Sequence, residues 1–131
     1  MKKPKKLTIG KLQKILWQET RRVADIIYPP KNGIFYCYIC GRPISGVNKQ
    51  LAHLIPKSVC GAFLKYDVYR NLKWCCFNDN INLGGNLAEY YRKMLQENGQ
   101  EFMDKLYFDK NNVSIKAYDH FEKLLEEYRK L

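Results

Sequence analysis

Two short motifs supply potential metal ligands on either side of His53. Cys37-x-x-Cys40 is followed by Gly41, and Cys76-x-x-Asp79 repeats the spacing with a carboxylate in its last place. A tetrahedral zinc ion commonly takes two ligands from each of two such turns. Three thiolates and one carboxylate also carry the same formal charge as four thiolates. The spacing therefore predicts a structural Zn²⁺ held by Cys37, Cys40, Cys76 and Asp79.

The other cysteines leave an alternative ligand set open. Cys75 precedes Cys76 directly, and both could bind one ion only if the backbone between them bends sharply. Cys60 stands alone before Gly61 and is expected to be a small buried thiol. An odd count of five cysteines disfavours a disulfide framework. A thioredoxin-like redox pair at Cys37 and Cys40 is the third reading, but it needs a helix directly after the pair, which the following Gly and Pro residues disfavour.

The order of the motifs resembles a known family. Cys37-x-x-Cys40-Gly41 is followed by Ala52-His53-x-x-Pro56-Lys57-Ser58, Tyr66-Asp67-x-x-x-Asn71-Leu72, Cys76-x-x-Asp79-Asn80 and Gly85-Asn86. Across residues 11–98 this order is similar to HNH endonucleases, and more closely to the NinG/Rap recombination endonucleases of lambdoid phages. The resemblance implies two strands and a helix around a catalytic metal. It implies His53 as general base, Asn71 as the residue that holds the loop and the base in place, and Asn80 beside the metal.

Phosphodiester hydrolysis needs the parts that the resemblance names. Histidine can deprotonate water near neutral pH, and a divalent cation, here expected to be Mg²⁺ or Mn²⁺, neutralises charge on the phosphate. Many HNH proteins have an acid before the base histidine, whereas this chain has Ala52. Asp67 is therefore the candidate carboxylate for the catalytic metal together with Asn80. Its competing role is to cap a turn or a helix.

The charge distribution predicts a polyanionic partner. The formal net charge is +10; residues 1–22 contain eight Lys or Arg and one acid, whereas residues 99–131 contain six and seven. DNA is the expected partner, although a solubilising surface would give the same composition. The candidate phosphate-binding side chains lie near the motifs and on the first predicted helix: Lys57, Arg70, Lys73, Lys11, Lys14, Arg21 and Arg22.

The elements that must position these residues are marked along the chain. Residues 1–7 are expected to form a flexible basic tail, and 8–28 a helical arm that Thr8 caps and Pro29-Pro30 ends. Residues 31–98 form the zinc and HNH centre, with a β-leaning piece at 34–38 and a helix from Asn86 to Gly99. Residues 99–131 form a C-terminal helical arm, whose apolar stripe from Ser114 onward predicts core packing or a homodimer.

We therefore expect a single α+β domain: a small zinc-stapled ββα-metal (HNH-like) centre with N-terminal and C-terminal helical arms. The expected function is metal-dependent cleavage of DNA, on branched recombination intermediates if the resemblance extends to the substrate. The alternative is a catalytically silent zinc module that binds nucleic acid. His120 lies apart from every motif and is expected to be structural. No apolar run predicts a membrane span or a signal peptide, so the expected location is the cytoplasm of a bacterium or a phage-infected host.

Overall fold

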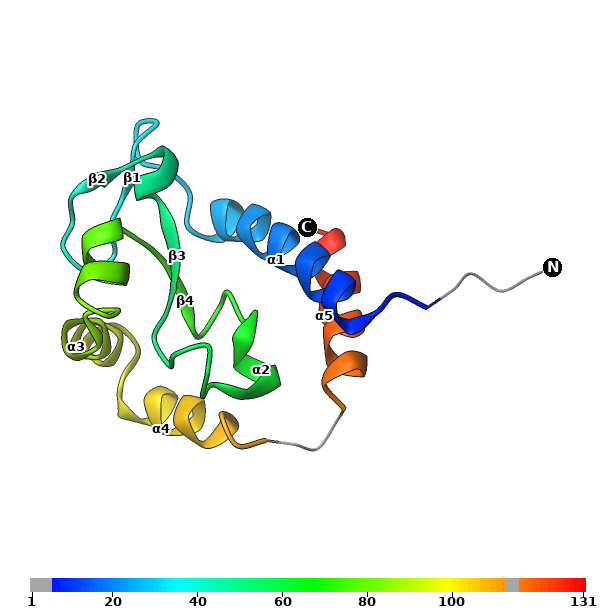
Figure 1. Cartoon of the computed structure of the whole chain (residues 1–131). Coiled ribbons are helices and arrows are strands. Elements are labelled where there is room, and N and C mark those ends of the chain that lie inside the picture. The colour runs from blue at the N-terminus through cyan, green and yellow to red at the C-terminus, as the bar shows by residue number, and fades with distance from the viewer. Residues whose placement is uncertain (1–5, 113–115) are drawn as a thin grey trace.

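The computed structural model describes residues 6–112 and 116–131, so Ser114 and most of the predicted tail lie outside the described residues. The structure is mixed α+β, with five α-helices and two short antiparallel ribbons among the described residues (Figure 1). None of the described helices is long and apolar enough to cross a membrane.

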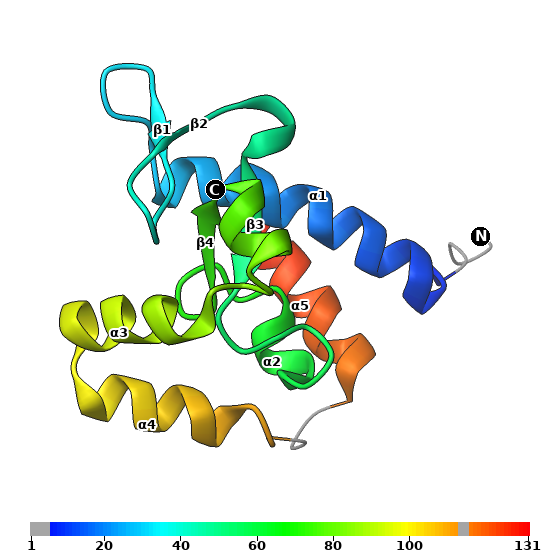
Figure 2. The same cartoon turned by 60° about the vertical axis from the view of Figure 1, so that its left-hand side comes forward.

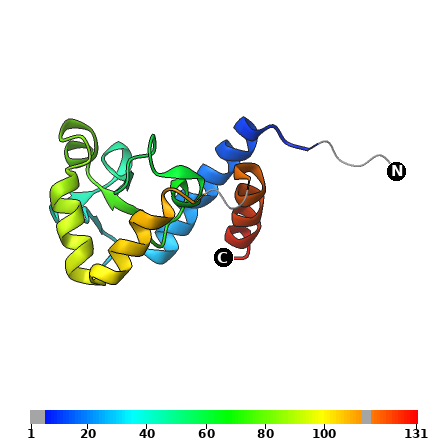
Figure 3. The same cartoon turned by 90° about the horizontal axis from the view of Figure 1, so that it is seen from below.

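The first helix, α1 (Ile9–Ile27), confirms the predicted helix and its cap. The Thr8 side chain accepts a hydrogen bond from the Lys11 backbone N–H, and the helix ends before Pro29. Leu12 and Leu16 are fully buried against the C-terminal helix α5 (Ala117–Arg129). The two predicted arms therefore do not extend separately from the centre. Figure 3 shows them side by side at one end of the molecule.

Two hairpins form the centre. β1 (Phe35–Tyr36) pairs with β2 (Pro43–Ile44), and β3 (Gln50–His53) pairs with β4 (Leu72–Cys75) so that His53 lies opposite Leu72. Between β3 and β4 runs a loop that contains the short helix α2 (Gly61–Lys65). A 3₁₀ turn, η1 (Gly46–Asn48), precedes β3, and a single π-helical turn, η2 (Asn78–Asn82), follows β4.

The remaining helices pack against this centre. α3 (Leu87–Asn98) and α4 (Gln100–Asp109) form an antiparallel pair, which Figure 2 shows below the β1–β2 hairpin. Gly99 joins the two with φ of +86°, a conformation that glycine adopts at little cost, and it ends α3 as predicted. Residues 99–112 and 116–131 thus form two helices on different faces of the centre.

One buried tyrosine links α5 to the segment before β4. The Tyr128 hydroxyl donates to the Tyr66 carbonyl at 2.5 Å and accepts from the Val68 N–H at 3.2 Å. The Tyr66 ring in turn packs edge-on against Phe121. Because α5 also covers α1, these contacts join both ends of the chain to the loop that carries Asn71.

Candidate metal centre and histidine site

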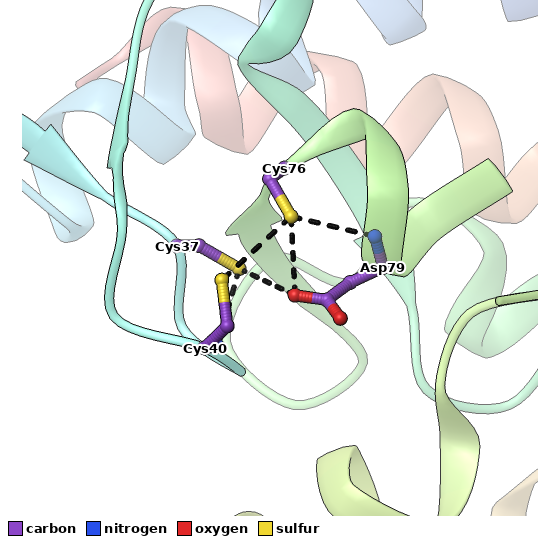
Figure 4. Close-up of side chains that lie close together, drawn as sticks. All are labelled: Cys37, Cys40, Cys76 and Asp79. Atoms are coloured by element: carbon purple, nitrogen blue, oxygen red, sulfur yellow. Dashed lines mark hydrogen bonds between the residues drawn. The ribbon is translucent and has the colours of Figure 1, made fainter. Parts of the chain in front are cut away.

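A cluster of three cysteines and one aspartate lies where the β1–β2 turn meets the end of β4. The cluster consists of Cys37, Cys40, Cys76 and Asp79, and one ligand atom from each lies within 4.8 Å of the others (Figure 4). Among the described residues no other group of three or more His, Cys, Asp or Glu side chains could hold a metal ion. The predicted ligand set is thus brought together.

The distances within this cluster fit a tetrahedral ion. Zn–S bonds of about 2.3 Å at the tetrahedral angle place two sulfurs about 3.8 Å apart. Cys40 Sγ and Cys76 Sγ are 3.8 Å apart, and Asp79 Oδ2 lies 3.2 Å from Cys37 Sγ and 3.1 Å from Cys76 Sγ. Because a Zn–O bond is shorter than a Zn–S bond, the sulfur–oxygen distances in such a site are shorter than the sulfur–sulfur distances. The cluster could therefore hold a metal, and its donors are compatible with structural zinc.

Local backbone geometry turns the sulfurs inward. Gly41 has φ of +77°, which lets the chain fold back so that the Gly41 N–H donates to the Cys37 carbonyl at 2.9 Å. The Cys40 N–H points at Cys37 Sγ at 3.5 Å, and the Asp79 N–H points at Cys76 Sγ at 3.3 Å. Each half of the cluster is thus a turn whose N–H groups stabilise sulfur as a thiolate.

Electrostatics already favour the anionic form of two of the four ligands. A hydrogen bond from Cys75 is the main reason why the pKa of Cys37 falls to about 5, against the opposing effect of burial. Burial raises the pKa of Asp79, but hydrogen bonds, chiefly from Cys76 and Cys40 with a further one from Asn86, outweigh it and hold that pKa below its usual value. Burial raises the pKa of Cys40 and Cys76, so a metal that binds here would displace their protons.

The structure places Asp79 in the cluster and Cys75 outside it. Cys75 is fully buried and lies outside the cluster, and its hydrogen bond with Cys37 together with burial raises its pKa, so it remains a neutral thiol. Cys60 is also buried and apart, with its sulfur near the carbonyls of Lys57 and Gly61. All five cysteines are free thiols in this structure.

Asn86 has a role that the sequence did not indicate. It was expected to cap α3, but its side chain makes no cap hydrogen bond and its backbone is left-handed, with φ of +45°. Its amide instead donates to Asp79 Oδ1 at 3.1 Å, the carboxylate oxygen that faces away from the sulfurs. Such partners of a ligand orient it toward the metal. The Gly85-Asn86 motif was visible in the sequence, but it did not indicate a contact with Asp79.

His53 lies at the end of β3 in a fixed orientation. Its Nε2 lies 2.8 Å from the Lys65 carbonyl oxygen, and Trp17 of α1 stacks on its ring with centroids 6.0 Å apart and an angle of 10°. Because a carbonyl oxygen only accepts, Nε2 carries the proton and Nδ1 keeps a free lone pair. Burial, with smaller contributions from Lys57 and Lys65, lowers the pKa of His53, so the ring is neutral at neutral pH.

Asn71 connects the loop after His53 to the segment before β4. Its side chain is fully buried: Oδ1 accepts from the Ile55 N–H at 2.8 Å, and Nδ2 donates to the carbonyls of Ile55 and Leu64 at 3.1 and 3.2 Å. All three partners lie in the loop between the strands. Asn71 therefore holds both ends of the segment that presents His53 and Lys65.

The structure does not assemble the second metal site that the sequence suggested. Asn80 donates to the Gln50 side-chain oxygen at 2.8 Å. Asp67 accepts from the backbone N–H groups of Tyr69 and Arg70 and from the Arg70 guanidinium, so it caps a turn, which was its competing role. Mg²⁺ and Mn²⁺ prefer carboxylate oxygens. Among the described residues no group of three or more potential ligands includes His53, so the catalytic Mg²⁺ or Mn²⁺ stays a prediction without a described ligand set.

Four of the seven candidate phosphate-binding side chains have other partners; one of them is Arg21, whose guanidinium lies 5.3 Å from the centroid of the Trp74 ring. Arg70 forms ion pairs with Asp67 and Asp109. Lys73 is almost buried, with its ammonium over the rings of Tyr28 and Tyr38.

Arg22 bonds Glu19 and the Tyr128 carbonyl. The partners of Arg70, Lys73 and Arg22 were not predicted. They lower the attraction of these three side chains for phosphate, because a charge that is neutralised or buried attracts phosphate weakly. Five candidates are exposed: Lys11, Lys14, Arg21, Arg22 and Lys57.

Two further expectations concern residues away from these clusters. Lys6 and Leu7, at the end of the predicted tail, contact Tyr118 of α5 through a cation–π contact and a hydrogen bond. His120 packs its ring against Phe63 with centroids 4.5 Å apart, and its Nε2 is buried without a hydrogen-bond partner. His120 is thus a packed residue. It lies far from the cysteine cluster in the sequence, and the contacts described for it involve no residue of that cluster.

Comparison with family models, with curated proteins and with solved structures found no match for this chain.

Proposed function

We propose that the protein is a DNA endonuclease built on a zinc-bound ββα unit of the HNH kind. The observation that carries this proposal is the state of His53, which is neutral, fixed through Nε2 and left with a free lone pair on Nδ1. A general base needs that combination. β3, β4 and the π-helical turn after them would be the ββα unit, and the cysteine cluster would join it to the β1–β2 hairpin.

In the proposed reaction, His53 Nδ1 takes a proton from a water molecule whose oxygen attacks the phosphorus. The bond between phosphorus and the leaving oxygen breaks, and that oxygen takes a proton from solvent. Asn71 and the Lys65 carbonyl would act as positioning groups, since they hold the imidazole and its loop. No step is assigned to a divalent cation, because the described residues around His53 show no ligand set for one.

The DNA backbone would bind along α1 and the loop after His53. Lys11, Lys14 and Arg21 are exposed on α1, and Lys57 is exposed four residues after the histidine. Trp17 lies on the same helix and stacks on His53, so the basic helix and the histidine belong to one surface. Each phosphate that these charges neutralise adds about −0.9 to the slope of log K against log salt.

One observation favours a second function, a zinc module that binds DNA without cutting it. HNH chemistry ordinarily uses a cation, and the two residues predicted to bind it have other partners: Asn80 donates to Gln50, and Asp67 accepts from Arg70. The two functions share the zinc cluster and the basic surface. They differ only in whether His53 does chemistry.

The two histidines provide a matched test. We expect His53→Ala to lower cleavage of linear, flapped and four-way DNA by about 10²- to 10⁴-fold, and to change DNA affinity less than twofold. His120→Ala removes the other partly buried imidazole and should leave cleavage unchanged. Each reaction is run with Mg²⁺, with Mn²⁺ and with no added divalent cation. Equal cleavage by the parent and His53→Ala, or no cleavage by the parent under any condition, would replace the endonuclease with the binding module.

A further inference from the structure

A second surface of the molecule has the features of a binding site. A pocket of about 450 Å³ opens between the end of α1, the β1–β2 hairpin and the start of β4, within the range of about 300 to 1,000 Å³ that small-molecule sites occupy. Its walls are mainly aromatic rings and prolines, including Tyr28, Pro29, Tyr36 and Tyr38. Lys73, one of the phosphate-binding residues that the sequence predicted, lines it, whereas His53 and the four cations assigned above to the DNA backbone do not.

The pocket also contains two polar groups. Lys73 is only 9% exposed, and its ammonium lies 4.2 Å from the Tyr28 ring centroid and 4.7 Å from that of Tyr38. Its ion pair with Glu97 measures 3.7 Å, longer than an N–H···O hydrogen bond. The ammonium therefore has hydrogen-bonding capacity for an acceptor that enters the pocket. Glu97 adds a carboxylate at the rim, where its side chain is 55% exposed.

We propose that this pocket binds a single unstacked nucleobase of the DNA substrate. Every nucleobase carries a hydrogen-bond acceptor beside an N–H donor on its pairing edge, which matches the adjacent ammonium of Lys73 and carboxylate of Glu97. The flat face of the base would stack on Tyr36, a residue that is 43% exposed. The inference rests on the proposed function, from which it takes the nucleic-acid substrate.

The charge around the pocket favours a nucleotide over a neutral ligand. Lys31 lines the rim and is exposed, so it can neutralise the phosphate attached to a bound base. A proline-rich peptide would also suit aromatic walls, but it carries no phosphate for Lys31 to neutralise. Because paired bases cannot enter a pocket, the site selects DNA with unpaired nucleotides.

The test compares single-stranded and duplex DNA of one sequence. The probe is a single-stranded oligonucleotide that carries one 2-aminopurine, and the protein is the full zinc-loaded chain with His53→Ala to prevent cleavage. We expect Tyr36→Ala to weaken single-strand binding by about 5- to 150-fold, as loss of one stacked base does, and to change duplex binding less than twofold. Tyr36→Phe keeps the ring and should bind as the parent does.

Tyr69→Ala is the matched control, because Tyr69 is similarly exposed, at 52%, and lies outside the pocket. Single-strand binding that Tyr36→Ala leaves intact overturns the inference, as does an oligoproline peptide that binds the pocket while single strands do not. If Tyr36 governs single-strand binding but the parent cuts no DNA, the endonuclease proposal fails and the base pocket stands. If the parent cuts DNA and Tyr36 has no effect, only the base pocket fails.

Discussion

Removal of the Asn71 side chain should destabilise the protein more than any other single loss of a neutral polar group near His53. Asn71→Ala deletes three buried hydrogen bonds, one from the Ile55 N–H and two to the carbonyls of Ile55 and Leu64. A buried hydrogen bond contributes about 0.5 to 1.5 kcal/mol net, so the three together contribute about 1.5 to 4.5 kcal/mol. We expect the free energy of unfolding to fall by about 3 kcal/mol.

The assay is guanidinium denaturation of the zinc-loaded protein at one fixed free-zinc concentration, followed by circular dichroism, with parent and variants compared under the same conditions. Asn71→Asp is an isosteric comparison: it keeps the acceptor for the Ile55 N–H but places a carboxylate oxygen against two carbonyls, so it should be at least as damaging. Asn80→Ala is the control, because this partly exposed side chain loses one hydrogen bond, to Gln50. A loss below about 1 kcal/mol in Asn71→Ala would refute this account of the loop.

Three more outcomes are expected. X-ray absorption of the purified protein should show one zinc per chain with three sulfurs at about 2.3 Å and one oxygen at about 2.0 Å, whereas four sulfurs would assign Cys75 in place of Asp79. Asn86→Ala should weaken zinc binding by about 10- to 100-fold in competition with a chromophoric chelator, because Asp79 loses its orienting partner; unchanged affinity would remove that role. An NMR titration should give His53 a pKa below the ordinary histidine value of about 6.5, since burial disfavours the imidazolium. His53 should therefore remain an active base at pH values somewhat below about 6.5. A raised pKa would contradict the orientation described above.

The cysteine cluster shows how much of the site can be predicted from residue spacing within single turns. Cys37 with Cys40, and Cys76 with Asp79, are pairs within single turns, so their spacing alone predicted that each pair converges. The same holds for the helix ends at Thr8 and Gly99, where a capping side chain and a permissive backbone act within one turn. The mixed α+β class followed from the change of period between the helical ends and the loop-rich centre.

Long-range packing decided the rest. Whether Cys75 or Asp79 joins the cluster depends on which way the chain turns after β4, and that direction is set by pairing with β3 and by the hydrogen bond between Asp79 and Asn86.

Nothing in the sequence indicated that three of the cations have partners on distant helices. Arg70 pairs with Asp109, Lys73 pairs with Glu97, and Arg22 donates to the Tyr128 carbonyl. Charge and residue type are visible along a chain, but the partner that neutralises a charge is chosen by the tertiary fold. The sequence alone therefore identified potential ligands and cations, and only the folded structure determined which of them remain available.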